Sequence, residues 1–134
     1  MAGKQKIPEG TRVVVADGGG ARILRNAGSD QSLSLEQVEM IDPAQLELAT
    51  PSGSRPPEQR GHEAEEAGFA KLLAQRLNDD ALNHRYEHLV LFADAQTLGQ
   101  MRPLLHKETQ SRLIAEHAKN LRNAPLDDIA RAMG

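Results

Sequence analysis

The stretch RVVVADGGGARILR, at positions 12–25, limits the possible folds more than any other part of the chain. A β-branched run ends at Ala16, and Asp17 with three glycines separates it from a second apolar segment, Ala21 to Asn26. β-branched residues favour strands, and glycine supplies the backbone conformations of a tight turn. The pattern predicts a β-hairpin at the start of the folded region.

The same glycines could also form a phosphate-binding loop, but neither common motif fits. A Walker loop requires a lysine directly after its last glycine, and no lysine stands near Gly20. The dinucleotide fingerprint requires a third glycine where this chain has Ile23. In both motifs the glycines lead into a helix that holds the anion, whereas here they lead into a strand pattern. We interpret the glycines as a hairpin turn.

Three further segments have strand patterns. Leu33 and Leu35, then Val38 and Met40, alternate in two pairs with a slip of one residue between them, which predicts a third strand with a bulge. The continuous apolar run EHLVLFA at positions 87–93 is typical of a central strand covered on both faces. The alternating residues at positions 113–117 predict a last strand, although a helix is an alternative there.

Three segments have helical patterns. Apolar residues recur at helical spacing between His62 and Asp80. Asp94 can cap a helix that runs to Leu105, which Pro103 should kink or shorten. We expect Asn123 to cap a terminal helix with Pro125 in its first turn. The order β-β-β-α-β-α-β-α predicts an α/β protein with a single mixed sheet, and this order is shared with ribonuclease H-like folds.

The chain length and loop composition predict the domain organisation. With 134 residues, the chain can form one self-sufficient core. We expect a flexible N-terminal segment over residues 1–11 and a single domain over residues 12–134. Residues 49–61 contain three prolines and two glycines, which predicts a mobile surface loop.

Composition argues against several classes of function. The net charge is −3, although from position 95 onward six Lys or Arg residues face four acids. The chain has three aromatic residues and no cysteine, so extensive base stacking and thiol chemistry are not expected. No apolar run approaches the ~20 residues of a membrane span, and the N-terminus does not resemble a signal peptide. These features predict a cytoplasmic protein without a membrane contact.

Carboxylates are the sharpest catalytic hypothesis. Asp17, Glu65 or Glu66, and Asp94 lie roughly where ribonuclease H-like nucleases place their metal-binding acids, so a metal-dependent nuclease is an alternative. However, Asp17 also suits a turn, Asp94 suits a helix cap, and the two glutamates suit a solvated helix face. We therefore expect no catalytic residues, metal or cofactor.

Several short motifs together resemble the bacterial host-attachment protein family. They are Ala16-Asp17-Gly18, Ala21-Arg22-Ile23, the His-Glu-rich start of the helix at His62, the strand LVLFA, the pair Leu98-Gly99, and the terminal AEHAKNLRNAPLDDIARAM. The resemblance extends over nearly the whole chain from Arg12 to Met133. That family is similar to the middle domain of archaeo-eukaryotic peptide-chain release factors, which implies a ribonuclease H-like or ribosomal-protein-like α/β fold.

The resemblance also implies an expectation about activity. Release factors act through a Gly-Gly-Gln tip before the long helix, whereas the corresponding loop here, RPPEQRGHEAEE, has Gln59 and Gly61 in the wrong order. We therefore expect a non-catalytic binding or regulatory module that acts through RNA or the ribosome and affects attachment indirectly.

The candidate phosphate contacts are Arg55, Arg60, Lys119 and Arg122. Solubility is the alternative explanation for these four side chains. A pure protein-interaction module is the other alternative for the whole chain, and the partner and oligomeric state stay open.

Overall fold

The structure, a computed structural model, describes residues 7–29, 33–42 and 62–133, and the side chains of residues 62–67 are outside the description. Its elements in chain order are β1 (Arg12–Asp17), β2 (Gly20–Asn26), β3 (Leu35–Ile41), α2 (His62–Leu82), β4 (Leu89–Ala93), α3 (Ala95–Met101), the 3₁₀ helix η1 (Arg102–Leu104), α4 (Lys107–Arg112), β5 (Leu113–Ala118) and α5 (Leu126–Met133).

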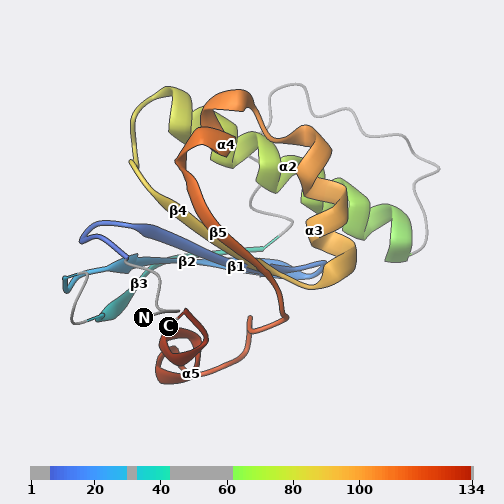
Figure 1. The fold of residues 1–134 in the computed structure, drawn as a ribbon. Helices are drawn as coiled ribbons and strands as arrows, with labels where there is room; N and C mark the ends of the chain where they lie inside the picture. The colour runs from blue at the N-terminus through green and yellow to red at the C-terminus, as the bar shows by residue number, and fades with distance from the viewer. Residues whose placement is uncertain (1–6, 30–32, 43–61, 134) are drawn as a thin grey trace.

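The strands form a single five-stranded mixed sheet in the order β3-β2-β1-β4-β5 (Figure 1). β1, β2 and β3 pair antiparallel, whereas β4 pairs parallel to both β1 and β5. The predicted α/β class, with three antiparallel strands followed by alternating helices and strands, is confirmed. The parallel arrangement brings the carboxyl ends of β1, β4 and β5 to one edge of the sheet.

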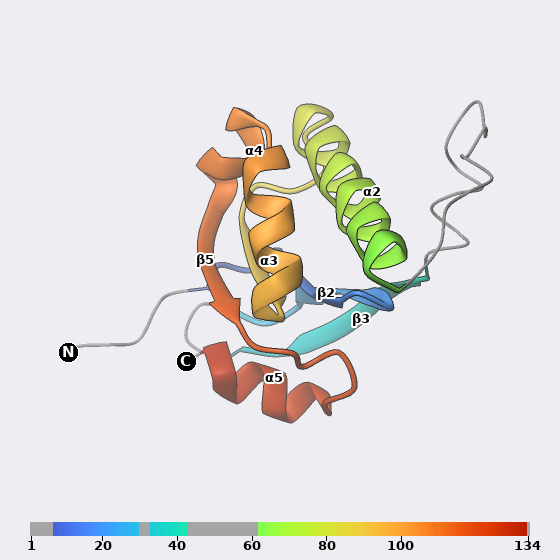
Figure 2. The same cartoon turned by 90° about the vertical axis from the view of Figure 1, so that its right-hand side faces the viewer.

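Helices cover both faces of the sheet, as Figures 1 and 2 show. α2, α3 and α4 lie over one face, where Phe69, Leu73 and Leu77 of α2 are buried in the larger hydrophobic cluster. α5 lies under the other face and buries Ile129 and Met133 against it. All five residues of β4 are buried, so the prediction of a central strand covered on both sides is confirmed.

The first hairpin and the bulge also agree with the sequence. Asp17 pairs with Gly20, which leaves Gly18 and Gly19 as a two-residue turn. Ile23 pairs with Glu39 and Leu24 with Gln37, so one residue of β3 is left without a partner in β2. This extra residue lies where the slip in the apolar alternation occurs.

The helix after Asp94 ends at Met101 and Pro103 lies in η1, so the expected shortening by Pro103 is confirmed. Helical segments differ from the prediction at two points. The short helix α4 is not predicted, because its sequence KETQSR has no apolar stripe; the ring nitrogen Nδ1 of His106 caps it by accepting a hydrogen bond from Glu108 N. The terminal helix begins at Leu126, and the expectation that Asn123 caps it is wrong. Pro125 occupies the cap position, since its carbonyl accepts from Ile129 N.

Residues 7–11, in the predicted N-terminal segment, lie against the domain in this structure. Ile7 is buried in the cluster that α5 covers, and Gly10 N donates to Asn26 O. The predicted loop at 49–61 lies outside the described residues. None of the helices in the described ranges is long and apolar enough to cross a membrane.

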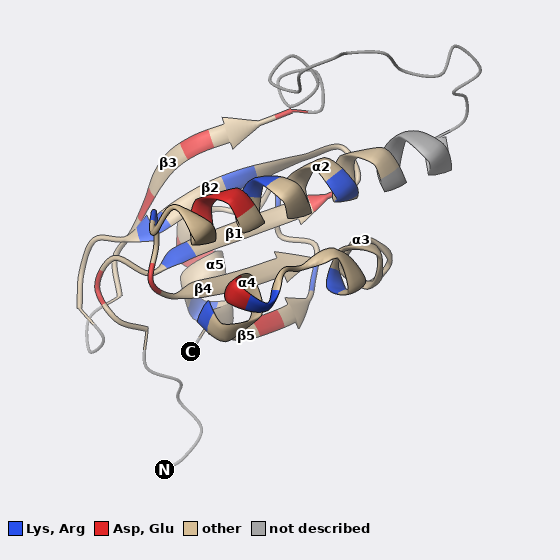
Figure 3. Ribbon diagram, turned by 90° about the horizontal axis from the view of Figure 1, so that it is seen from above, with Lys and Arg blue, Asp and Glu red and all other residues tan. Residues whose placement is uncertain are grey.

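Charged residues of both signs alternate over the face that α2, α3 and α4 cover (Figure 3). Many of them form ion pairs, such as Arg76 with Glu39 and Arg112 with Glu108. Asp80 is almost buried and contacts both Arg12 and Arg76. These ion pairs compensate charges of opposite sign on the described part of this face.

Candidate binding site

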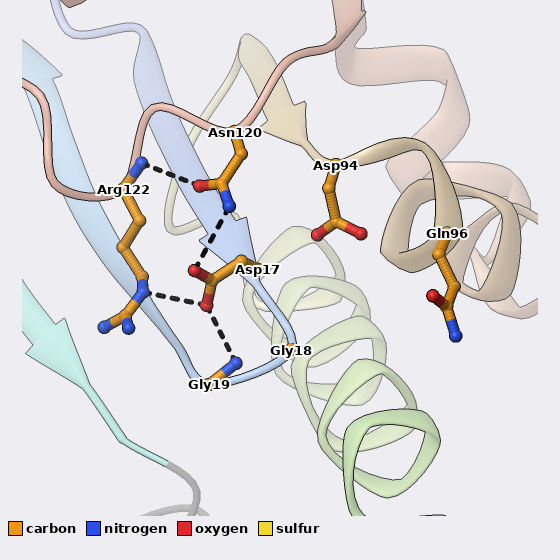
Figure 4. Close-up of a pocket in the computed structure, with 7 residues that line it drawn as sticks. All are labelled: Asp17, Gly18, Gly19, Asp94, Gln96, Asn120 and Arg122. Atoms are coloured by element: carbon orange, nitrogen blue, oxygen red, sulfur yellow. Dashed lines mark hydrogen bonds and ion pairs between the residues drawn. The ribbon is translucent and has the colours of Figure 1, made fainter. Parts of the chain in front are cut away.

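Polar side chains converge where the three parallel strands end. Asp17 is the last residue of β1, Asp94 follows β4 directly, and Asn120 lies two residues beyond β5. The ends of these strands form an open pocket of about 340 Å³ (Figure 4). Its lining residues are Asp17, Gly18, Gly19, Asp94, Gln96, Asn120 and Arg122. In α/β sheets, ligands bind preferentially beyond the carboxyl ends of parallel strands.

Asp17 connects the hairpin turn to the segment after β5. Its Oδ1 accepts a hydrogen bond of 2.8 Å from Gly19 N and lies 2.8 Å from Arg122 Nε, in an ion pair rather than a well-aligned hydrogen bond. Asn120 Nδ2 lies 3.5 Å from Asp17 Oδ2 (Figure 4). The side chains of Asp17 and Arg122 are 17% and 27% exposed, so water screens their attraction only in part. Asp17 therefore has a structural partner as well as a position in the pocket.

Two more residues of the hairpin, Gly20 and Arg22, contact the segment after β5. Arg22 Nη1 donates to the carbonyl oxygens of Arg122 and Ala124 at 2.9 and 2.7 Å. A Cβ atom at Gly20 would lie 2.8 Å from Arg122 Nη1, so only glycine lets the guanidinium approach this closely. We call Asp17, Gly20, Arg22 and Arg122 the latch, because together they fix the loop between β5 and α5 to the first hairpin.

Asp94 has one satisfied and one unsatisfied carboxylate oxygen. Oδ2 accepts a hydrogen bond of 3.2 Å from Thr97 N and so caps α3, as the sequence predicts. Oδ1 is buried and has no hydrogen-bond partner among the described residues. A buried acceptor without a donor costs about 1–3 kcal/mol. Asp94 is therefore the residue of the pocket that most needs a donor.

Of the predicted site residues, Asp17 and Asp94 lie in one pocket. The side chains of Glu65 and Glu66 are outside the described part of α2. Among all residues that the structure describes, no group of three His, Asp or Glu side chains is placed to hold a metal ion. Participation of the two glutamates therefore stays a prediction.

The four predicted phosphate contacts have different positions. Arg122 lines the pocket, whereas Lys119 is exposed one residue before Asn120 and is not among the lining residues. Arg55 and Arg60 lie outside the described residues. Phosphate contact stays a prediction for all four.

Sequence reasoning missed Gln96 and Asn120. An exposed glutamine in the first turn of a helix and an asparagine in a loop are common, so neither residue stands out by type. A usable signal is that each residue lies within three positions after a strand of the expected β-α-β segment, because strands connected through a helix are usually parallel. Because such strands end at one edge, polar residues after each of them are expected to meet.

His117 of β5 packs against the sheet near the pocket. Its ring stacks on Phe92 with centroids 4.7 Å apart. Burial, and after it the charge of Lys119, lowers the pKa of His117 below the usual 6.5. The imidazole therefore favours the neutral form in the folded protein.

The fold and pocket define a single-sheet α/β domain with a polar site at the ends of its parallel strands. The chain belongs to bacterial archaeo-eukaryotic release factor family 12, whose family model matches residues 10–133. No curated protein matches the chain closely enough to be recognised as a relative. The expected relationship to archaeo-eukaryotic release factors is thus confirmed over nearly the whole chain.

Proposed function

We propose that this protein is a non-catalytic, translation-related module of the bacterial cytoplasm that binds RNA or the ribosome. The family match over residues 10–133 carries the proposal, because release factors of the related class work on the ribosome. The chain contains no Gly-Gly-Gln sequence, with which such factors release the peptide. Binding without peptide release is the combination that agrees with both observations.

The proposal places the RNA contact beside the pocket. Lys119 is exposed at the end of β5, and Arg122 follows at the pocket itself. Arg55 and Arg60, which precede α2 and lie outside the described residues, are the further candidates. Contacts between cationic side chains and phosphates supply affinity without sequence specificity. A modest set of such contacts is compatible with an overall charge of −3.

Cosedimentation with purified bacterial ribosomes tests the proposal. Wild-type protein should sediment with ribosomes at low salt and lose binding as potassium chloride is raised. The double variant Arg55→Gln/Arg60→Gln and the single variant Lys119→Gln should bind more weakly, and each lost phosphate contact should reduce the logarithmic salt slope by about one. Lys71→Gln, at an exposed position of α2, is the matched control and should bind like wild type.

Two results would contradict the proposal. Failure of the wild-type protein to bind ribosomes or bulk RNA at any salt concentration would exclude the translation-related module and leave a protein-interaction module. Hydrolysis of peptidyl-tRNA on ribosomes by the purified protein would exclude the non-catalytic part of the proposal.

A metal-dependent nuclease is a second candidate, since Asp17 and Asp94 line one pocket. The ion pair of Asp17 with Arg122 weighs against it, because the guanidinium already compensates one carboxylate. Titration with Mn²⁺ under amide NMR distinguishes the two candidates. Paramagnetic broadening centred on Asp17 and Asp94, together with nuclease activity that Asp94→Ala abolishes, would favour the nuclease.

The role in attachment to host cells belongs to the same proposal. We infer that such a role is indirect and follows from an effect on translation or on an RNA. Deletion of the coding gene should then change the abundance of surface proteins as well as attachment. Unchanged surface proteins with reduced attachment would contradict the indirect role.

A further inference from the structure

We propose that the pocket recognises a ribose hydroxyl group of an RNA strand, with Asp94 as its acceptor. This inference rests on the proposed function, because it assumes that the bound partner is RNA. An RNA strand offers three kinds of group to a protein: phosphates, bases and ribose hydroxyls. The charge, the hydrogen-bonding groups and the aromatic content of the site select among them.

Phosphate is the least suitable group for the pocket itself. Asp17 and Asp94 contribute two carboxylates to the lining, and Arg122 contributes one guanidinium. The guanidinium is paired with Asp17, so the charge of Asp94 has no partner cation in the pocket. A phosphate would be repelled there, whereas Lys119 outside the lining can meet a neighbouring phosphate.

Bases lack a platform in the described part of the molecule. Protein sites for single-stranded RNA commonly stack bases on aromatic side chains. The three aromatic residues of this chain, Phe69, Tyr86 and Phe92, are all at most 4% exposed. None of them can stack on a base without leaving the core, so these three rings favour recognition of the strand through its backbone.

A ribose hydroxyl matches the groups that the pocket presents. It can donate to a carboxylate and accept from an amide with the same oxygen. Asp94 Oδ1 is buried without a donor, and the amide side chains of Gln96 and Asn120 line the same pocket (Figure 4). A small shift of a neighbouring side chain of the pocket, with Oδ2 still bound to Thr97 N, would open the unsatisfied Oδ1 to the ligand. The volume of about 340 Å³ lies at the lower end of ligand pockets and accommodates a group of this size.

Fluorescence anisotropy with three labelled 12-nucleotide strands of one unstructured sequence tests the inference. The strands are RNA, its 2′-O-methyl form and DNA, and the buffer contains EDTA so that no divalent ion bridges the contact. Wild-type protein should bind RNA about tenfold more tightly than the other two strands, since one hydrogen bond to a charged acceptor has this effect. Asp94→Asn should lower the preference below about threefold while α3 keeps its cap, because asparagine caps helices as well as aspartate does.

The matched control is Asp79→Asn, which makes the same chemical change at an exposed position of α2 away from the pocket. It should keep the full preference for RNA. Equal binding of the three strands by wild-type protein, or an unchanged preference in Asp94→Asn, would overturn the ribose site while leaving RNA binding intact. A preference that appears only when Mg²⁺ replaces EDTA would also overturn it.

Failure of the proposed function gives a different result. If neither ribosomes nor any strand binds, adenosine and 2′-deoxyadenosine are titrated against the amide spectrum. Shifts at Asp94, Gln96 and Asn120 with adenosine alone would support the ribose site with a free nucleoside as ligand. The same response to both nucleosides, or none to either, would overturn it.

Discussion

At the scale of single residues, the glycines of the first hairpin have different tasks. Gly18 and Gly19 form the turn, whereas Gly20 begins β2 and leaves space for the guanidinium of Arg122. A Cβ atom at Gly20 would also lie 3.1 Å from the carbonyl oxygen of Ile41, which belongs to the backbone and cannot easily withdraw. The third glycine of the motif is therefore required by packing.

We expect Gly20→Ala to destabilise the protein by about 1–3 kcal/mol, as overpacking of a close contact does. Urea unfolding followed by circular dichroism measures the change. Gly99→Ala is the matched control, because a Cβ atom at this position of α3 meets nothing within 4 Å. The control should be neutral or stabilising by up to about 1 kcal/mol, since alanine favours helix. Equal effects of the two substitutions would contradict the packing role of Gly20.

A second residue-scale prediction concerns acid. The pKa of His117 is lowered in the folded state, chiefly by burial, so the unfolded chain binds this proton more tightly. The contribution of His117 to stability is therefore complete above pH 6.5 and is lost as the pH falls through 6.5 toward the folded pKa. Between pH 7.5 and 5.0, His117→Phe should lose less unfolding free energy than wild type, while its ring still stacks on Phe92. Parallel pH profiles of the two proteins would contradict this.

At the scale of elements, the end of α2 is sharply defined. Arg85 N donates to Asp80 O and His84 N donates to Ala81 O, the two hydrogen bonds of a Schellman motif. His84 has a φ of 58°, a left-handed conformation in which glycine is the usual residue. The helix therefore ends by backbone geometry that its own sequence does not favour.

We expect His84→Gly to stabilise the protein by roughly 0.5–1 kcal/mol, because relief of the left-handed conformation outweighs the entropy that glycine loses on folding. Thermal and urea unfolding measure the gain. Asn83→Gly serves as the comparison, since Asn83 is not among the residues with positive φ, and it should destabilise. A loss of stability in His84→Gly would show that the contact of 3.3 Å between the His84 ring and Arg112 Nη2 matters more.

At the scale of the whole molecule, the latch joins the first hairpin to the last helix. Arg22 holds the two carbonyl groups before α5, and α5 is the one helix of the described residues under its face of the sheet. The residues below it, such as Val13, Val15 and Phe92, are completely buried. The packing of α5 on this apolar face therefore depends on the hydrogen bonds that fix the loop before α5.

Hydrogen exchange tests this dependence. In Arg22→Met the amides of α5 should exchange about tenfold faster or more, because two hydrogen bonds from a charged group are lost. The amides of α2 should keep their wild-type rates. Arg25→Met is the control on the same strand, since Arg25 is 46% exposed and pairs with Glu36 on the surface. Equal acceleration in the two variants, or acceleration throughout the chain, would argue against a local latch.

Much of this architecture is predictable because it follows from local patterns. The alternation of apolar and polar residues and the continuous apolar run predict the strands, and Asp94 predicts the start of α3 as its N-cap. The missed features depend on residues that are distant in the chain: Arg122 pairs with Asp17, and Asn120 and Gln96 line the same pocket. α4 was missed because its polar sequence has no periodicity. The residues of the pocket can be grouped only when the order and direction of the strands in the sheet are known.

The latch also has a consequence for the order of folding. Asp17 and Asn120 are 103 positions apart in the chain, whereas β1 pairs with its neighbour in sequence, β2. The hairpin closes through local contacts, but the pocket is complete only when the segment after β5 has reached the hairpin. Such distant contacts slow folding. The pocket therefore forms after the hairpin that supplies its first residues.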